Sequence, residues 1–145
     1  MKIFIAGIMQ GSLVEKSIHR QDYREELKKL LADRFPGAEI YDPYEKNKNS
    51  LYYGVETGRE TFMRHNNMCG QEIDLLVAFV PEASMGTAIE MWEAYKNGAT
   101  VITISEMTRN WAVKFLSHAI YPNLESFSEA IKTLAWPLPA TAQKG

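Results

Sequence analysis

The chain has 145 residues, a length that fits one domain with a hydrophobic core of its own. Hydrophobic residues make up 46% of it and charged residues 23%, as in ordinary globular proteins. The formal net charge is -2 at pH 7, so no broad positive surface for a nucleic-acid polymer is expected. A small phosphorylated ligand is compatible with these values, because it needs only a local site.

The compartment expected from the sequence is the cytoplasm. Cys69 is the single cysteine, so it cannot form an internal disulfide or contribute to a zinc set of several cysteines. The apolar run at residues 1–7 is too short for a signal peptide. No run approaches the roughly 18 apolar residues that a membrane span needs. We therefore expect no membrane partner.

Short apolar runs and helical periods alternate along the chain. Strands are expected at residues 3–7, 38–41, 75–80, 100–104 and 119–121, and helices at residues 22–34, 59–72, 85–97, 110–117 and 124–134. This alternation predicts an α/β fold: a doubly wound, Rossmann- or flavodoxin-like parallel sheet of five strands with helices on both faces. We expect residues 1–136 to form one domain and residues 137–145 a poorly ordered tail.

Two of the expected helices have apolar residues that indicate which side faces the core. In the helix at 59–72, Phe62, Met63 and Met68 are expected to point inward. In the helix at 85–97, one stripe is taken as the core face: Met85, Ala88, Trp92 and Tyr95. Glu90 would then lie on the opposite side, where a carboxylate is either solvated or functional.

Ligands on such sheets bind beyond the carboxyl ends of the strands, which singles out the loops at 7–12, 42–58 and 81–87. The segment 44–58 is the longest irregular stretch, and loops of that length are often functional. In the third loop, Gly86 opens a helix whose free N–H groups can bind an anion. Glu90 follows within about one turn of that end.

The first loop contains Gln10, Gly11 and Ser12, which can supply donors to a phosphate or form a simple turn. It has neither the Gly-Lys-Ser/Thr of a Walker A loop nor the glycine spacing of a dinucleotide fingerprint. The histidines, His19, His65 and His118, are far apart, so no metal site is predicted. No Gly-x-Ser-x-Gly elbow for a catalytic triad is present either.

Three features together resemble the nucleoside 2-deoxyribosyltransferase superfamily. The first strand ends in an Ala-Gly element, Phe4-Ile5-Ala6-Gly7. The central strand begins with an acid, Asp74-Leu75-Leu76-Val77-Ala78-Phe79. Sixteen residues beyond Asp74 comes the family's catalytic-glutamate motif, here Gly86-Thr87-Ala88-Ile89-Glu90-Met91-Trp92-Glu93-Ala94. The resemblance covers about residues 1–105.

The resemblance implies a retaining glycosyl mechanism without a cofactor. The family glutamate attacks the anomeric carbon and forms a covalent glycosyl-enzyme, which a second base or a water resolves; Glu90 matches this nucleophile. Two positions depart from the pattern. The family tyrosine of the first strand falls on Phe4, and the family aspartate eight residues before the central-strand acid falls on Asn66. Asn67, Tyr52 or Tyr53 are candidates to compensate.

A third position discriminates between branches of the family. Six residues before the glutamate, the nucleoside transferases carry an aspartate, whereas the branch that hydrolyses 2′-deoxynucleoside 5′-monophosphates has a serine, here Ser84. The first-loop arginine of that branch falls on Gln10. The positive charge would then come from another residue: Arg20, Arg59, Arg64 or Lys114. The substrate-binding residues implied are Phe4, Gly7, Met9, Gln10, Gly11, Ser84 and Gly86, with Glu90 and Asn66 as catalytic residues.

Three functions follow as hypotheses. The first is an N-glycosidase that cleaves the base–sugar bond of a nucleoside 5′-monophosphate through Glu90. The second is base exchange between deoxynucleosides by a 2-deoxyribosyltransferase. The third is a non-catalytic nucleotide sensor that uses the same pocket. In each case the partner is a small nucleotide or nucleoside, and the resemblance implies a homodimer or a higher homo-oligomer.

Overall fold

A computed structural model of the chain describes residues 1–11, 13–15, 17–133 and 136–137. Its sheet has five strands in the order β2-β1-β3-β4-β5, and every neighbouring pair is parallel. The strands are β1 (Lys2–Gly7), β2 (Glu39–Tyr41), β3 (Leu75–Phe79), β4 (Thr100–Ile104) and β5 (Ala119–Tyr121). This is the strand order of flavodoxin-like sheets, with a topological switch point between β1 and β3.

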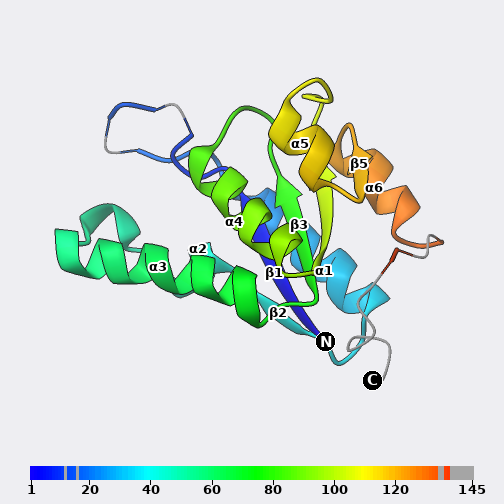
Figure 1. Cartoon of the computed structure of the whole chain (residues 1–145), viewed down its shortest axis with the longest axis horizontal. Helices are drawn as coiled ribbons and strands as arrows, with labels where there is room; N and C mark the ends of the chain where they lie inside the picture. Colours follow the sequence, from blue (N-terminus) through cyan, green and yellow to red (C-terminus); the bar gives the residue numbers. More distant parts are fainter. Residues whose placement is uncertain (12, 16, 134–135, 138–145) are drawn as a thin grey trace.

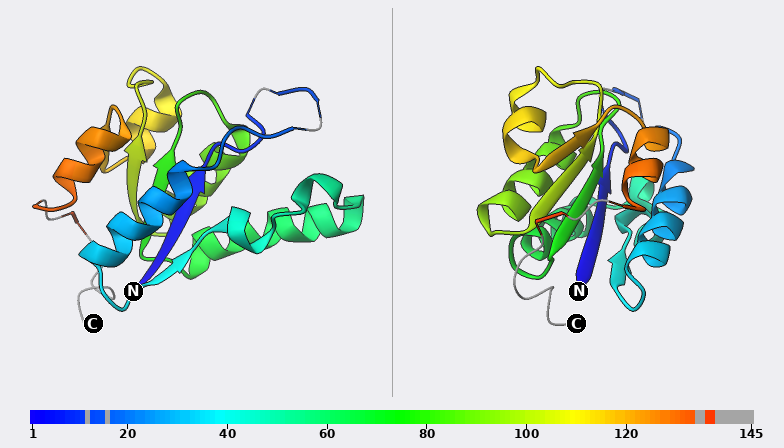
Figure 2. Two further views of the ribbon diagram at one scale, coloured as in Figure 1. Left: turned by 180° about the vertical axis from the view of Figure 1, so that it is seen from behind. Right: turned by 90° about the vertical axis from the view of Figure 1, so that its right-hand side faces the viewer.

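Helices connect the strands as crossovers (Figure 1). They are α1 (Tyr23–Arg34), α2 (Pro43–Lys46), the 3-10 helix η1 (Ser50–Tyr52), α3 (Val55–Gln71), α4 (Met85–Lys96), α5 (Trp111–Leu116) and α6 (Leu124–Ala130). α1 and α6 lie on one face of the sheet and α3, α4 and α5 on the other (Figure 2). The predicted α/β fold of one parallel five-stranded sheet with helices on both faces is confirmed.

The two faces of the sheet have separate cores because successive residues of a strand point to opposite sides. Ile3, Ile5 and Val77 pack with Leu27 of α1 on one face. Phe4, Ala6, Leu76 and Ala78 pack on the other face with residues of α3 and α4. The strands are therefore apolar on both sides, as a sheet covered on both faces requires.

The predicted irregular stretch at 44–58 is more ordered than expected. Asp42 caps α2 by accepting a hydrogen bond from the Tyr44 backbone N–H at 3.0 Å, with Pro43 in the first turn, where proline is tolerated. α3 begins at Val55, four residues before the expected start. Its first half extends away from the sheet together with α2 and η1 (Figures 1 and 2). In that half Phe62 and Met63 are exposed, so the prediction that they point inward is wrong, whereas Met68 is buried.

The predicted core face of α4 is also wrong. Thr87, Met91 and Ala94 are buried, whereas Met85 is 82% exposed and Trp92 50% exposed. The physical reason is the close approach of α3: a β-carbon on Gly70 would lie 3.0 Å from a Glu93 carboxylate oxygen. Thr87, Met91 and Ala94 therefore face the interior, and Met85 and Trp92 are left outside.

The last elements are shorter than expected, since α6 ends at Ala130. Of the predicted tail at 137–145, only Pro137 belongs to the described part of the chain, where its carbonyl accepts a hydrogen bond from the Thr100 hydroxyl. Among the described helices, none combines the length and the apolar character that crossing a bilayer requires.

Candidate functional site

Three loops meet at the carboxyl edge of the sheet because β2, β1 and β3 are parallel neighbours. They follow Tyr41, Gly7 and Phe79, the last residues of these strands. The loops at 7–12, 42–58 and 81–87 therefore lie around the β1/β3 switch point, where ligands of such sheets bind. The structure places the predicted site residues along this edge and on the two helices, α3 and α4, that lead away from it.

The end of β1 is closely covered by α1. A β-carbon on Gly7 would collide with the Tyr23 hydroxyl, which donates a hydrogen bond to the Ile8 carbonyl at 3.1 Å. Phe4 is fully buried three residues earlier, and its ring stacks on Tyr41 at 5.5 Å between centroids. In this structure Phe4 is a core residue, and Gly7 is the point at which the helix approaches the strand most closely.

The first loop is held by backbone contacts. The His19 N–H donates to the Met9 carbonyl at 2.6 Å, and Gly11 adopts a positive φ of 56°, which favours glycine. The Gln10 side chain is exposed and lies 3.4 Å from the Leu13 carbonyl. Ser12 lies outside the described residues. His19 Nε2 lies 2.9 Å from a Glu82 carboxylate oxygen, which links this loop to the one that leads into α4.

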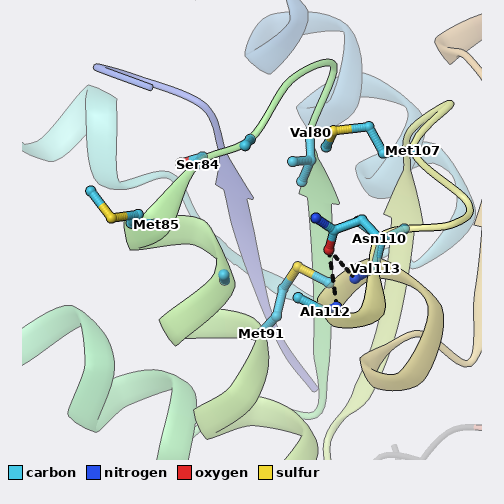
Figure 3. A pocket seen from close by; sticks show the side chains of 10 residues that line it. Val80, Ser84, Met85, Met91, Met107, Asn110, Ala112 and Val113 are labelled. Atoms are coloured by element: carbon cyan, nitrogen blue, oxygen red, sulfur yellow. Dashed lines mark hydrogen bonds between the residues drawn. The ribbon is translucent and has the colours of Figure 1, made fainter. Parts of the chain in front are cut away.

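α4 begins at the third loop with a side-chain cap. Ser84 Oγ accepts a hydrogen bond from the Thr87 backbone N–H at 3.4 Å and lies 2.9 Å from Thr87 Oγ1. A β-carbon on Gly86 would meet nothing within 4 Å, so the helix start is open to a ligand. Ser84 also borders a cavity of about 150 Å³ between α4 and α5, which Met91 and Val113 line with apolar surface (Figure 3).

Glu90 lies on the inner side of α4, between the buried Thr87 and Met91, and not on the solvated side that the sequence predicted. α3 and α4 run in the same direction because both lead into parallel strands. Gly70 of α3 approaches Glu93 of α4 closely. The two predicted catalytic residues therefore lie on adjacent helices.

The surroundings of Glu90 favour its protonated form. Burial raises the pKa of the Glu90 carboxyl from 4.5 to about 7, and the positive charge of Arg24 partly offsets this. No hydrogen bond or ion pair to Glu90 is present among the described residues. Burial also raises the pKa of the Cys69 thiol, with further contributions from Glu90 and Glu93, which places Cys69 beside the same carboxylates.

Asn66 is more than nine-tenths buried, and one of its polar atoms lacks a partner. Its Nδ2 donates to the Phe62 carbonyl at 2.9 Å within α3. Its Oδ1 has no hydrogen-bond partner among the described residues. A buried amide oxygen without a partner is costly and rare, so it is a candidate acceptor for a ligand group.

A larger cavity of about 340 Å³ lies between the first loop and the α2–α3 segment. Met9 and Gln10 line one side of it, and His65 and Asn47 contribute buried polar groups. Asn47 Nδ2 lies 3.3 Å from His65 Nε2, and burial lowers the pKa of His65 to about 4, with Arg64 and Arg24 adding to the effect. The imidazole is therefore neutral at physiological pH, and the cavity is a mainly apolar one with a few uncharged polar groups.

The predicted site residues thus fall into three groups. Met9 and Gln10 line the larger cavity, Ser84 borders the smaller one, and the remaining residues line neither. These remaining residues are Phe4, Gly7, Gly11, Asn66, Gly86 and Glu90. Among the described residues, no three His, Cys, Asp or Glu side chains are grouped so that they could hold a metal ion.

Sequence reasoning missed a buried ion pair beneath these loops. Arg24 of α1 is 1% exposed and donates to Asp42 Oδ1 at 3.0 Å. The available signal was the spacing of Arg24, Leu27 and Leu31, which places a cation on the buried stripe of α1. His65 and Asn47 were missed as well, since nothing in their local sequence distinguishes them from exposed polar residues.

No protein-family model matches the chain, and no curated protein matches it. Among solved structures, a 2-deoxyribosyltransferase from the psychrotolerant bacterium Bacillus psychrosaccharolyticus aligns with a TM-score of 0.65 at 18% identity, over 88% of this chain and 90% of that one. A conserved protein from Enterococcus faecalis aligns with a TM-score of 0.54 at 21% identity, over 91% and 97% of the two chains. A CMP N-glycosidase from Clostridium botulinum gives 0.49 at 19% identity, over 91% and 98%. The first two similarities show that the chain shares this α/β fold.

Proposed function

We propose that the protein is an N-glycosidase of the nucleoside 2-deoxyribosyltransferase superfamily that cleaves the base–sugar bond of a nucleoside 5′-monophosphate through Glu90. The observation that supports this most directly is the place of Glu90. It is a partly buried carboxylate on α4 beside the buried Thr87 and Met91, and the helix that carries Asn66, α3, packs next to α4. A solvated surface carboxylate would not have a pKa raised to about 7 by burial.

The proposed reaction has two steps. The ionised Glu90 carboxylate attacks C1′ of the sugar, so a bond forms from its oxygen to C1′ while the bond from C1′ to the base nitrogen breaks. The base leaves with the electron pair of that bond and takes up a proton from solvent. A water molecule then attacks C1′, releases Glu90 and leaves the free sugar phosphate. Asn66 orients the base or sugar through its unpartnered Oδ1, and as an amide it supplies no acid.

The start of α4 supports a phosphorylated substrate. The first N–H groups of the helix and the open backbone at Gly86 present donors and a partial positive charge. Ser84, at the N-cap, adds a hydroxyl where an aspartate would repel the phosphate. A nucleoside 5′-monophosphate therefore fits this end of the site better than a sugar with a free 5′-hydroxyl.

The direct test is incubation of wild-type protein and Glu90→Gln with a panel of nucleoside and 2′-deoxynucleoside 5′-monophosphates. Free base should be released by the wild type and fall by about a thousandfold or more in Glu90→Gln, as expected for loss of a nucleophile. Rapid quenching and intact-mass analysis should show a wild-type adduct with the mass of the sugar phosphate. Binding without release of base from any substrate would instead indicate a nucleotide sensor.

Base exchange between deoxynucleosides is the second candidate, because the Bacillus psychrosaccharolyticus structure that shares this fold is a 2-deoxyribosyltransferase. Both reactions pass through the same covalent Glu90 intermediate and differ in what resolves it. Incubating the protein with a deoxynucleoside and a second free base separates them. A new nucleoside indicates exchange, whereas free sugar alone indicates hydrolysis.

We propose further that the chain forms a homodimer or a larger homo-oligomer. Large apolar side chains are exposed on α3 and α4, where a monomer would leave them in water. They include Met63 on α3 and Met85, Ile89 and Trp92 on α4, whereas the exposed Phe62 lines the larger cavity.

A further inference from the structure

The larger cavity, between the first loop and the α2–α3 segment, has apolar walls and a polar edge without charge. Large apolar side chains line it, among them Met9, Ile18, Leu51 and Phe62. Amides, hydroxyls and one imidazole are also present, and no Asp, Glu, Lys or Arg is among the lining residues in the part of the chain that the structure describes. A volume of about 340 Å³, apolar walls and a few polar groups are the usual properties of a site for a small organic ligand.

Asn47 lines this cavity, and its neighbours fix the orientation of its side-chain amide. Its Oδ1 lies 3.4 Å from the Arg64 guanidinium, which can only donate, and accepts a hydrogen bond from the Tyr53 hydroxyl at 3.1 Å. Its Nδ2 donates at 2.9 Å to the Pro43 carbonyl, which can only accept. The amide cannot be reversed without losing these contacts, so Nδ2 faces His65 Nε2 as a donor at 3.3 Å.

This orientation determines which ring nitrogen of His65 carries the proton. Nε2 accepts from the Asn47 amide, so it carries no proton, and the neutral imidazole has its proton on Nδ1. Burial, which lowers the pKa of His65 to about 4, agrees with a neutral ring. Nδ1 has no hydrogen-bond partner among the described residues. His65 is 9% exposed and lines the cavity, so it brings a donor without a protein partner to the lining.

The His65 imidazole is held in place and lies next to a candidate catalytic residue. Its ring meets those of Phe4 and Tyr41 edge to face, at centroid distances of 6.1 and 5.8 Å. His65 directly precedes Asn66 on α3. The Phe62 carbonyl accepts the hydrogen bond from Asn66 Nδ2, and the Phe62 side chain lines the cavity. The cavity and Asn66 therefore share about one turn of α3.

We propose that His65 determines which ligands the larger cavity takes, by donating its Nδ1–H to a ring nitrogen or carbonyl oxygen of an uncharged nucleobase. The apolar walls suit the two faces of a planar ring, and the amides and hydroxyls suit its polar edge. A charged ring would lose its hydration without gaining an opposite charge from the described lining residues. That the ring is the base cleaved from the nucleotide rests on the proposed function.

Two substitutions of His65 separate the roles of its ring nitrogens. In His65→Gln the amide reaches about the place of Nε2, so the contact with Asn47 can be kept while the donor at Nδ1 is lost. In His65→Asn the amide reaches about the place of Nδ1, so a donor is kept while the contact with Asn47 is lost. The dissociation constant of hypoxanthine should rise about tenfold in His65→Gln and less in His65→Asn. A purely structural role predicts the opposite order, because the asparagine variant loses the contact inside the protein.

The experiment is ¹H–¹⁵N NMR of the imidazole signals, with those of His65 assigned by their loss in His65→Gln. Long-range correlations in the free wild type should show a proton on Nδ1. Titration with hypoxanthine or uracil should then shift the Nδ1–H signal and give the dissociation constants. Orotate, which is uracil with a carboxylate, is the charged control and should bind at least about tenfold more weakly than uracil.

Thermal unfolding identifies variants that do not fold. If His65→Gln does not fold, the tautomer and the comparison of uracil with orotate in the wild type decide the question. A proton on Nε2, equal affinities of wild type and folded His65→Gln, orotate binding as tight as that of uracil, or no binding of either base overturns the inference. Bases that bind through His65 without release of base from any nucleotide support it and refute the proposed reaction. Base release with an unchanged kcat/KM in His65→Gln supports the reaction and refutes the role of His65.

Discussion

At the scale of single residues, burial favours the protonated form of the Glu90 carboxylate, whereas the proposed reaction needs it ionised. The pKa of Glu90 is raised from 4.5 to about 7, so near neutral pH the two forms are close to equally populated. Carboxylates with a pKa near neutral pH are typical of functional sites. A fully buried ionised carboxylate would destabilise the fold, whereas a fully solvated one would keep its ordinary pKa.

The raised pKa of Glu90 predicts a pH-dependent cost to stability. The Glu90 carboxyl binds its proton more tightly in the folded state than in the unfolded state, so protonation of Glu90 stabilises the fold. This contribution to the unfolding free energy is fully present below pH 4.5 and is lost as the pH rises through about 7. Glu90→Gln removes this dependence. Between pH 4 and pH 8 the difference in unfolding free energy should change by up to about 3 kcal/mol in favour of the glutamine variant.

Urea unfolding of wild type and Glu90→Gln at several pH values measures this difference. Glu60→Gln, which removes an exposed carboxylate from α3, is the control and should show no comparable trend. A constant difference between wild type and Glu90→Gln across the range would show that Glu90 ionises as freely in the folded state as in the unfolded chain.

At the scale of elements, the apolar pattern of the sequence was sufficient to predict the bounds of some strands but not the buried face of α4. The strand at Thr100–Ile104 and the edge strand at Ala119–Tyr121 have the bounds that their apolar runs predicted. In α4, however, two apolar stripes compete, and hydrophobicity alone favours the one with Met85 and Trp92. The choice is made by the tertiary packing of α4 against the sheet and α3, which buries Thr87, Met91 and Ala94 instead.

The same limit applies to the candidate site. A resemblance to a known family singled out Glu90 and Asn66, which lie on the adjacent helices α4 and α3. The buried pair of Arg24 and Asp42 could not be found this way, because the two residues lie 18 positions apart and meet only when α1 packs on the sheet. Contacts between distant residues depend on the tertiary packing and leave no local periodicity.

Two substitutions of Ser84 should separate its role as the helix cap of α4 from its effect on substrate binding. Ser84→Ala removes the cap and should lower the unfolding free energy by about 1 kcal/mol. Ser84→Asp keeps a good N-cap and should unfold near the wild-type temperature, but its carboxylate repels a phosphate. Its kcat/KM should therefore fall for the 5′-monophosphate and be unchanged or higher for the nucleoside. Equal losses for both substrates would argue against a phosphate at this helix start.

At the scale of the whole molecule, the arrangement of α3 bears on assembly. Its first half extends beyond the sheet together with α2 and η1 (Figure 1). Helices gain most of their stability from packing an apolar face, so a projecting half-helix with exposed Phe62 and Met63 is poorly stabilised in a monomer. α4, which packs beside α3, exposes Met85 and Trp92 as well.

A second copy of the chain packed on this surface would bury both helices, and most homo-oligomers form closed symmetric interfaces of this kind. Light scattering should then give a mass of at least twice 16.5 kDa for the wild type. The double variant Met63→Glu/Trp92→Glu places charges in the interface and should dissociate it. Trp111→Glu, which changes a 77% exposed tryptophan on α5, should leave the mass unchanged. A wild type that stays monomeric at high micromolar concentration would show that α3 projects without a partner copy.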